Sequence, residues 1–318
     1  MYRLHLVPNN TKIQFMKGRF AGLIVSAVLS IASVILFFYP GLNYGIDFRG
    51  GILFEVRTQG PADFPTMRTA LGTIGVGPIA LQQFGSPQDV LIRLERQAGD
   101  EGAQEQAIAK VRATLASKFP GTDVRRVEAV GATVSAELFH DGLMAVALAL
   151  VAMLGYIWFR FEWQFGVGAV VTLILDVTKT IGWYAVTDLQ FNLTSVAAIL
   201  TIMGYSINDK VVVYDRMREN LRKYKSMPLR QLIDLSINET LSRTINTSLT
   251  TFLATIPLAL MGGESVQGFA LTILFGIVVG TSSSIFIAAP ILLFLGENRL
   301  RRAPAPDDKT APVNPAGA

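Results

Sequence analysis

Cysteine is absent from this chain of 318 residues, and histidine occurs only twice, at His5 and His140. Disulfide bonds and thiolate metal sites are therefore excluded, and no histidine-based metal centre is predicted because the two histidines lie far apart in sequence. Charged residues are also scarce, at 16% of the chain against roughly 25% in an average soluble protein. Hydrophobic residues make up 51%. This composition predicts a membrane protein with neither a metal ion nor a cofactor.

Six segments of the sequence are apolar and long enough to cross a membrane as helices. At about 1.5 Å of rise per residue, a helix of about 20 residues spans the hydrocarbon layer of a bilayer. The predicted spans are residues 20–39, 142–159, 165–186, 189–214, 246–261 and 268–295. The first run ends in FFYPG rather than in a small-residue cleavage site, so we expect an uncleaved anchor.

The distribution of basic residues predicts how the spans are oriented. Arginine and lysine crowd the link at 215–245 and follow the last span, whereas the short links around Asp188 and Glu264 contain neither. By the positive-inside rule, both termini are cytoplasmic and the region between the first two spans lies outside. The net charge of +4 follows this pattern, so it does not predict a nucleic-acid partner.

Residues 42–137 predict a small α+β domain between the first two spans. Alternating apolar residues indicate strands at 51–58, 78–84, 89–95 and 123–130, and helical spacing indicates helices at 61–73 and 101–119. The order βαββαβ is typical of a ferredoxin-like fold, in which two helices cover one antiparallel sheet. Its carboxylates alternate with arginine and lysine as on a solvated surface, so no catalytic site is predicted. We expect residues 43–137 to fold alone.

The predicted fold class is thus an α-helical polytopic membrane protein with six transmembrane helices and one periplasmic ferredoxin-like domain. Its regions are a cytoplasmic N-terminus (1–19), the first span (20–41), the domain (42–137), a five-helix membrane region (138–295) containing the cytoplasmic loop 215–245, and a tail (296–318). The tail is rich in proline and alanine and has too few large apolar residues to fold. No function is assigned to it.

Three polar residues, Asn208, Asp209 and Lys210, interrupt the fourth predicted span. An ionisable group inside a spanning helix costs at least about 2.5 kcal/mol, so it faces other helices or a water path more readily than lipid. Asp209 is the main candidate for a functional group. We expect Lys210 either to have a lowered pKa or to be paired, most simply with a carboxylate on a neighbouring span or on a partner subunit.

A second polar pair, Asp176 and Lys179, lies in the third predicted span. The two residues are spaced i to i+3 and therefore share one helix face. Two interpretations stay open. Either the pair only neutralises itself, or Asp176 faces the same polar interface as Asp209.

Arg243 lies toward the cytoplasmic end of the fifth span, which is an antiparallel neighbour of the span that carries Asp209. An ion pair between them is geometrically possible. In the alternative, Arg243 extends to the lipid headgroups and Asp209 is only interfacial. Thr247 and Thr251 belong to a hydroxyl stripe along the fifth span, which indicates either close helix packing or a water path.

Paired glycines predict two close approaches of the backbone. Asp47, Gly50 and Gly51 belong to DFRGG, which follows the first span and indicates a tight turn there. No Lys-Ser or Lys-Thr follows, so a phosphate cradle is not indicated. Gly276 and Gly280 form a GxxxG pair in the last span, which predicts a helix contact.

Four blocks of the sequence resemble the SecD/SecF family of protein-export subunits. They are GYSINDKVVVYDR at 204–216, YGIDFRGG at 44–51, SINETLSRTINTSLTT at 236–251 and, more loosely, EAVGATVSAEL at 128–138. Their order and spacing agree with the family as well as their letters. The chain departs from the family pattern at Lys210, where a small hydroxyl residue is usual, and at Tyr214, where phenylalanine is usual.

The resemblance implies a six-span bundle of the resistance-nodulation-division type and a non-enzymatic role in protein export. Proton motive force would promote late translocation or release of an unfolded polypeptide across the bacterial inner membrane, with SecD, the SecYEG channel and YajC as partners. It also implies that Asp209 carries the proton, that Arg243 gates it and that Asp176 belongs to the pathway. The supporting polar residues in this hypothesis are Asn208, Lys210, Lys179, Thr247 and Thr251.

Two other classes of function are weighed against this one. A proton-driven exporter of small molecules or lipids shares the related six-span bundle, but such exporters typically have much larger external domains. An intramembrane enzyme would need a catalytic set, and the sequence contains no HExxH or GxSxG motif and no paired intramembrane aspartates in a protease-like context.

Overall fold

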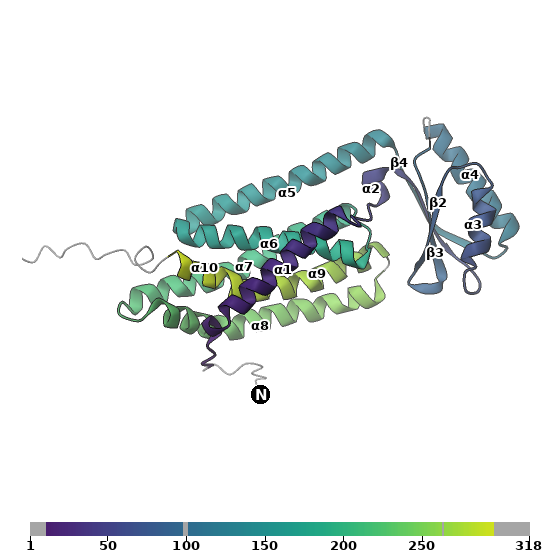
Figure 1. Cartoon of the computed structure of the whole chain (residues 1–318). Coiled ribbons are helices and arrows are strands. Elements are labelled where there is room, and N and C mark those ends of the chain that lie inside the picture. Colours follow the sequence, from purple (N-terminus) through teal and green to yellow (C-terminus); the bar gives the residue numbers. More distant parts are fainter. Residues whose placement is uncertain (1–10, 98–100, 263, 296–318) are drawn as a thin grey trace, which may run out of the picture.

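The computed structural model of the chain describes residues 11–97, 101–262 and 264–295. A bundle of long helices carries a small α/β domain at one end (Figure 1). The long helices are α1 (Arg19–Phe38), α5 (Ala132–Arg160), α6 (Trp163–Thr187), α7 (Leu193–Lys223), α8 (Leu229–Met261) and α9 (Glu264–Ser283). After α9 the chain makes one π-helical turn, η2 (Ser284–Ala288), and continues as α10 (Ala289–Phe294).

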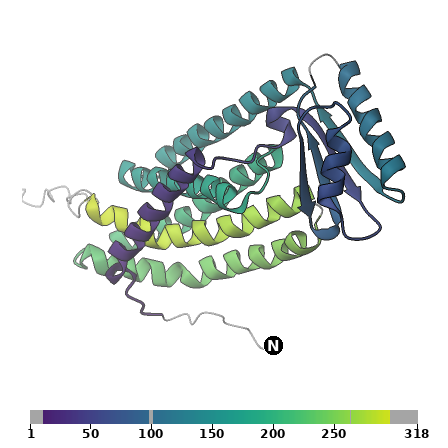
Figure 2. The same ribbon diagram turned by 45° about the vertical axis from the view of Figure 1, so that its right-hand side comes forward.

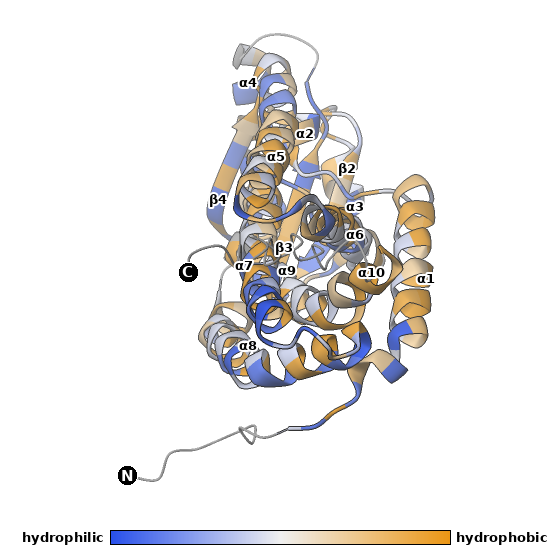
Figure 3. Ribbon diagram, turned by 90° about the vertical axis from the view of Figure 1, so that its left-hand side faces the viewer, coloured by the Kyte–Doolittle hydropathy of each residue, from blue (hydrophilic) through white to orange (hydrophobic). Residues whose placement is uncertain are grey.

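The part of the chain that the structure describes contains six helical segments long and apolar enough to span a membrane. This confirms the six predicted spans. The central three, α6, α7 and the segment from α9 to α10, are at least half buried by the protein, whereas α1 and α5 bury less than a fifth of their residues. Seen from the end far from the α/β domain, α1 is a largely apolar helix at the edge of the bundle (Figure 3).

Small residues let the helices of the bundle approach closely. Ser33 of α1 is buried against Gly182 of α6, where a Cβ atom would collide with its hydroxyl group. Gly276 and Gly280 of α9 lie against Ile202 and Ser206 of α7. The helix contact predicted from the GxxxG pair is thus confirmed, and it brings α7 and α9 together at the polar centre described below.

The segment 215–245 is not the loop that we predicted. It is helical apart from residues 224–228, because α7 continues to Lys223 and α8 begins at Leu229. Ion pairs let its charged residues stay on helices: Arg216 Nε lies 2.8 Å from Glu239, and its guanidinium also contacts Glu219 at 2.6 Å. Polar residues gather at this end of the bundle, around the link between α7 and α8 (Figure 3).

Two further boundaries differ from the expected ones. Helix α5 starts at Ala132, inside the range 42–137 that we assigned to the soluble domain. Helix α7 starts at Leu193 rather than at 189, because Asn192 and Ser195 form a capping box that closes its first turn. Residues 1–10 of the predicted N-terminus and the predicted tail 296–318 lie outside the described residues.

The α/β domain has the predicted order βαββαβ. Its elements are β1 (Gly51–Arg57), α3 (Phe64–Gly72), β2 (Ile79–Phe84), β3 (Ser86–Leu94), α4 (Glu101–Lys118) and β4 (Asp123–Val130). The antiparallel sheet has the order β2-β3-β1-β4, with Phe54 of β1 opposite Ile92 and Val127. This is the topology of a ferredoxin-like fold, so the predicted fold class is confirmed.

Alternation along the strands builds a core that belongs to this domain alone. Ile52, Phe54 and Val56 of β1 point the same way and are fully buried together with Leu71 of α3 and Leu115 of α4. The two helices cover the face of the sheet that is turned away from the bundle (Figures 1 and 2). The core of the bundle is a separate cluster of residues.

An aromatic joint connects the domain to the bundle. Between α1 and β1, the short helix α2 (Ile46–Arg49) packs against α5 and against the turn before α7. The rings of Tyr44, Phe48, Phe139 and Phe191 contact one another with centroids 5.6–6.4 Å apart. The backbone adds hydrogen bonds from Gly45 N–H to the Phe191 carbonyl, at 2.9 Å, and from Phe191 N–H back to Asn43.

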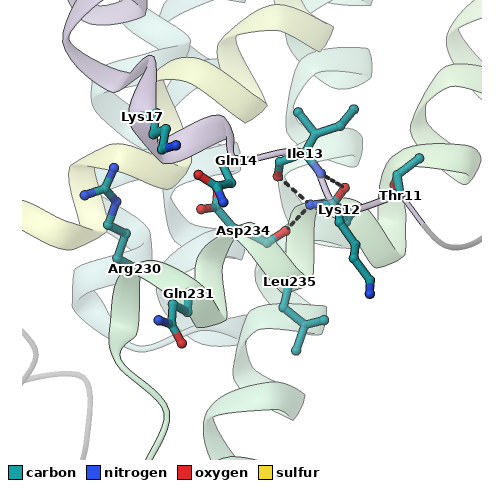
Figure 4. Close-up of a pocket in the computed structure, with 10 residues that line it drawn as sticks. Thr11, Lys12, Ile13, Gln14, Lys17, Arg230, Gln231, Asp234 and Leu235 are labelled. Carbon is teal, nitrogen blue, oxygen red and sulfur yellow. Dashed lines mark hydrogen bonds between the residues drawn. The ribbon is translucent and has the colours of Figure 1, made fainter.

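The segment before α1 is attached to α8 at the opposite end of the bundle. Ile13 donates its backbone N–H to the Asn238 amide oxygen at 3.0 Å, and Met16 donates its N–H to Asp234 at 2.9 Å. Around these bonds lies a cavity of about 480 Å³ whose lining includes Lys17 and Arg230 (Figure 4). The start of α1 is therefore fixed to α8, although the two segments are far apart in sequence.

Candidate functional site

In the part of the chain that the structure describes, four charged side chains are buried in the middle of the bundle, two on each of two neighbouring helices. Asp176 and Lys179 lie on α6 and are 1% and 5% exposed. Asp209 and Lys210 lie on α7 and are 6% and 0% exposed. Two acids and two bases thus share one low-dielectric interior, which is where ionisable groups in membrane helices carry function.

Asp176 is an ion-paired carboxylate. Its Oδ2 atom accepts hydrogen bonds from the Lys210 ammonium at 3.0 Å and from the hydroxyls of Ser206 and Ser283 at 2.7 Å each. Its Oδ1 atom lies 3.6 Å from the Lys179 ammonium. Asp176 thus pairs with Lys179 on its own helix and also reaches α7 and α9. The interpretation in which the pair only neutralises itself is therefore wrong.

Lys210 has the partner that we predicted for it. The ion pair with Asp176 joins α7 to α6, so the carboxylate is on a neighbouring span of this chain. The ammonium also donates to the Ser206 backbone carbonyl at 3.3 Å and contacts the Ser206 hydroxyl. A buried charge this well compensated is stable only as part of the whole cluster.

Asp209 is held in a different way. Its Oδ1 atom accepts a hydrogen bond from the Thr244 hydroxyl of α8 at 2.6 Å, and its Oδ2 atom accepts one from the Ser284 hydroxyl. Among the described residues, none of the ion pairs includes Asp209. The side chain of Lys210, the next residue, is directed to Asp176 instead. Asp209 is therefore a buried carboxylate with hydroxyl partners and no paired cation.

The π-helical turn after α9 connects the two carboxylates. Ser283 ends α9 and binds Asp176, while Ser284 begins η2 and binds Asp209. Single π-helical turns occur frequently at functional sites, because the extra residue per turn redirects neighbouring side chains. Sequence reasoning missed Ser206, Ser283 and Ser284. The run Thr281 to Ser284 inside an apolar span was the available signal.

Arg243 does not contact Asp209. Its side chain is exposed and lines an open pocket of about 1010 Å³ together with Arg160, Arg216 and Arg222. The same pocket is lined by Val212, three residues after Asp209, and by Thr240, one turn before Thr244. The ion pair that we considered possible is thus absent from this arrangement of α7 and α8, and the pocket ends one helical turn from Asp209.

The remaining supporting residues lie away from the buried cluster. Asn208 is exposed on the side of α7 opposite Asp209 and Lys210. Thr247 and Thr251 donate to the backbone carbonyls of Arg243 and Thr247, at 3.0 and 2.9 Å. These bonds match the packing interpretation of the hydroxyl stripe. Two members of the same stripe bond to other helices instead: Thr244 binds Asp209 of α7, and Ser248 contacts Tyr205 of α7 and Thr281 of α9.

The DFRGG block forms the turn into the α/β domain. Gly50 and Gly51 have φ angles of +72° and +119°, in the region that favours glycine, and Gly51 lies so close to the Leu94 carbonyl that no Cβ atom fits. Asp47 accepts a hydrogen bond at 3.0 Å from the backbone N–H of Leu193, the first residue of α7. The block therefore attaches the domain to the helix that carries Asp209.

Comparison with known families gives two matches. A family model described as "Protein export membrane protein SecD/SecF, C-terminal" matches residues 110–298. A second model, "SecD/SecF GG Motif", matches residues 35–62, which contain Gly50 and Gly51. The first covers more than half of the chain, including the buried cluster.

Relatives and solved structures agree with these models. The protein translocase subunit SecF of Rickettsia bellii is 44% identical over 303 residues, which cover 95% of this chain and 99% of that protein. SecF of Rhodobacter capsulatus is 42% identical over 320 residues, covering 97% and 96%.

The crystal structure of SecDF from Thermus thermophilus, a translocon-associated membrane protein, matches with a TM-score of 0.83 and 33% identity. The match covers 91% of this chain but only 39% of that longer chain. SecDF in a super-membrane-facing form matches with a TM-score of 0.63 and the same identity. The order of the spans, the glycine turn and 42–44% identity over nearly the whole chain lead to one conclusion: the chain belongs to the SecF family of protein translocase subunits.

Proposed function

We propose that this SecF family member is a non-enzymatic subunit of the Sec export machinery that uses proton motive force to promote late translocation or release of unfolded polypeptides. Asp209 carries the proton in this proposal. The observation that supports it is the environment of Asp209, a buried carboxylate that is bound by hydroxyl groups and has no ion pair with any cation in the described part of the chain. Such a group can take up and release a proton without breaking an ion pair.

A hydroxyl partner suits a proton carrier for a chemical reason. The hydroxyls of Thr244 and Ser284 donate to the ionised carboxylate, and each can rotate to accept when the carboxyl is protonated. An ammonium group has no lone pair and can only donate. The open pocket lined by Val212 and Thr240 is large enough to admit water one helical turn from Asp209, at the end of the bundle that we assign to the cytoplasm.

Arg243 is the proposed gate. It lines the wall of that pocket and directly precedes Thr244, the partner of Asp209. A shift of α8 along α7 would bring the Arg243 guanidinium to the Asp209 carboxylate and favour the ionised form of Asp209. The reverse shift would separate the two groups and allow Asp209 to take up a proton. The two solved structures of SecDF match this chain at equal identity but with different TM-scores, 0.83 and 0.63. This difference supports the proposal that the fold has more than one arrangement.

Helix α7 is the proposed link to the α/β domain. Asp209 lies in its middle, and its first residue, Leu193, is bonded to Asp47 beside the glycine turn. A movement of α7 against α6 and α8 would therefore be passed to the domain through Asp47 and the aromatic joint. We propose that this domain is periplasmic and handles the emerging polypeptide, that both termini are cytoplasmic, and that the protein resides in the bacterial inner membrane.

The proposed partners follow from the match to the longer SecDF chain. The solved relative is a single SecDF polypeptide of which this chain matches 39%, so a separate SecD subunit would supply the rest. SecYEG and YajC complete the proposed assembly. The weakly buried helices α1 and α5 offer apolar faces for these subunits or for lipid.

Translocation in membrane vesicles tests the proposal, measured with and without an imposed proton gradient. Asp209→Asn keeps the size of the side chain but cannot ionise, so the variant should assemble with its partners and lose the gradient-dependent part of export. Asp215→Asn is the matched control, because Asp215 is an exposed carboxylate on the same helix. Full gradient dependence in Asp209→Asn would place the carrier elsewhere, with Asp176 next in line.

Arg243→Met should lose the same component if Arg243 is the gate. Arg222→Met is its control, because Arg222 lines the same pocket without adjoining Thr244. Equal effects of the two substitutions would show that only the positive charge of the pocket matters, and would remove the gate from the mechanism.

A further inference from the structure

The side chain of Lys210 ends inside a closed shell of oxygen atoms. It is 0% exposed, and its ammonium lies 3.0 Å from Asp176 Oδ2, 3.2 Å from Ser283 Oγ and 3.3 Å from the Ser206 carbonyl oxygen. The Ser206 hydroxyl is a fourth contact. One carboxylate, two hydroxyls and one carbonyl, contributed by α6, α7 and α9, thus surround a single positive charge.

This set of ligands is the one that a hard monovalent cation would take. Oxygen atoms of carboxylates, carbonyls and hydroxyls are the preferred ligands of hard cations, and in membrane proteins they replace the hydration shell of the ion. The orientation of the hydroxyls fits as well. Ser206 and Ser283 both donate their protons to Asp176 Oδ2, so their lone pairs face the ammonium. The hydroxyl groups of the shell are therefore oriented to coordinate a cation.

The charges of the buried cluster give a second reason. Asp176 and Asp209 are balanced by Lys179 and Lys210, and removal of the Lys210 ammonium would leave one uncompensated negative charge in the interior. The Lys179 ammonium does not take the place of the Lys210 ammonium, because it lies 3.6 Å from Oδ1, the other oxygen of Asp176. An empty shell would consequently attract a small cation from solution.

We infer that Lys210 is a tethered cation: its ammonium occupies a monovalent-cation site formed by Asp176, Ser206 and Ser283, and thereby excludes Na⁺ from the bundle. Occupation of this site does not depend on the proposed function. Its consequence for coupling does rest on that function, since a chain that cannot admit Na⁺ here is left with H⁺ at Asp209 as the driving ion.

Two substitutions separate the charge of Lys210 from its volume. Lys210→Ser removes the ammonium and most of the side chain, which leaves the oxygen shell open to a cation. Lys210→Met removes the charge but fills the space with an apolar chain of similar length. The inference predicts that the first variant binds Na⁺ and that the second does not.

The measurement is thermal unfolding of the purified full chain in detergent, in NaCl and in choline chloride at equal ionic strength. Choline is too large for the shell, so the difference between the salts reports specific binding of Na⁺. Lys210→Ser should melt at least about 2 °C higher in saturating NaCl than in choline chloride. The wild-type chain and Lys210→Met should show no difference, and adding Asp176→Asn to Lys210→Ser should abolish the response.

Three results would overturn the inference: a Na⁺ response of the wild-type chain as large as that of Lys210→Ser, no response of Lys210→Ser, or an equal response of Lys210→Met. Lys210→Ala is a second open variant with the same expected response. If neither open variant folds in either salt, Na⁺ does not replace the ammonium and the inference is also wrong. Loss of gradient-dependent export is measured separately, so failure of the proposed function would leave this result unchanged.

Discussion

Asp176 and Asp209 are the same residue type, lie on adjacent helices of one bundle and are both almost completely buried, yet their surroundings differ in kind. Asp176 has two ammonium groups and two hydroxyls around it, whereas Asp209 has two hydroxyls. Burial alone therefore does not separate the two carboxylates. The nature of their partners does, because an ion pair favours the ionised form and a hydroxyl group accommodates either form.

The comparison predicts which carboxylate the fold depends on. Asp176→Asn removes the ion-pair partner of two buried ammonium groups, so it should lower the free energy of unfolding by about 3–5 kcal/mol. Asp209→Asn keeps an amide between the same two hydroxyls and should cost only about 1–2 kcal/mol. Thermal unfolding of the purified variants in detergent measures both. Equal destabilisation by the two substitutions would show that Asp176 is not the structural member of the pair.

A compensated variant sharpens the same point. In Asp176→Asn combined with Lys210→Met, one of the two orphaned ammonium groups is removed, so the double variant should be more stable than Asp176→Asn alone. The expected coupling free energy is about 1–3 kcal/mol, as for other pairs in direct contact. Thermal unfolding of the two single variants and the double variant gives this value. Additive effects would mean that the 3.0 Å contact contributes no net stability.

A third carboxylate, Asp89, lies in the α/β domain, where its ion-pair partner Arg57 is partly exposed to solvent. It allows the buried ion pair of the bundle to be compared with a solvated one. Two hydrogen bonds from the Arg57 guanidinium, of 2.7 and 2.6 Å, hold the pKa of Asp89 down to about 2. An unfolded chain has an Asp pKa of about 3.9, so this pair stabilises the domain above about pH 4, and the contribution is lost as the pH falls toward about 2. Because Arg57 is partly exposed, solvent screens the pair, and we expect its contribution to the stability of the domain to be the smallest of these effects.

Acid unfolding of residues 43–137, expressed alone, measures this effect. The separate core of the domain predicts that the fragment folds. Asp89→Asn should unfold with a weaker pH dependence between about pH 4 and 2 than the unchanged fragment. An identical pH dependence would contradict the role of the pair, and a disordered circular dichroism spectrum would contradict the domain boundaries.

The sequence predicted the elements of the fold well and the contacts of the site only in part. Periodicity gave the order βαββαβ and six spans, because alternation and long apolar runs are local signals. The helical continuation of 215–245 was missed because charged residues were taken to end the spans, whereas pairs such as Arg216 with Glu239 keep them on helices.

Within the site, reasoning from single residues found the buried charged groups but not the different partners of the two carboxylates. Lys210 was expected to have a carboxylate partner because a lone ammonium is costly in the interior, and this rule holds wherever the partner lies. The ion pair considered possible between Asp209 and Arg243 depends instead on the register of α7 against α8, which no local pattern determines. Ser283 and Ser284 were missed for a similar reason, since a π-helical turn decides which carboxylate each hydroxyl reaches.

Infrared difference spectroscopy of the purified chain tests most directly whether Asp209 exchanges protons while Asp176 does not. A buried carboxyl group absorbs apart from solvated ones when it is protonated, so its band can be followed as the pH is lowered. We predict one such band in the unchanged chain and in the compensated variant Asp176→Asn with Lys210→Met, and its loss in Asp209→Asn. A band that persists in Asp209→Asn, or that disappears in the compensated variant alone, would contradict the account.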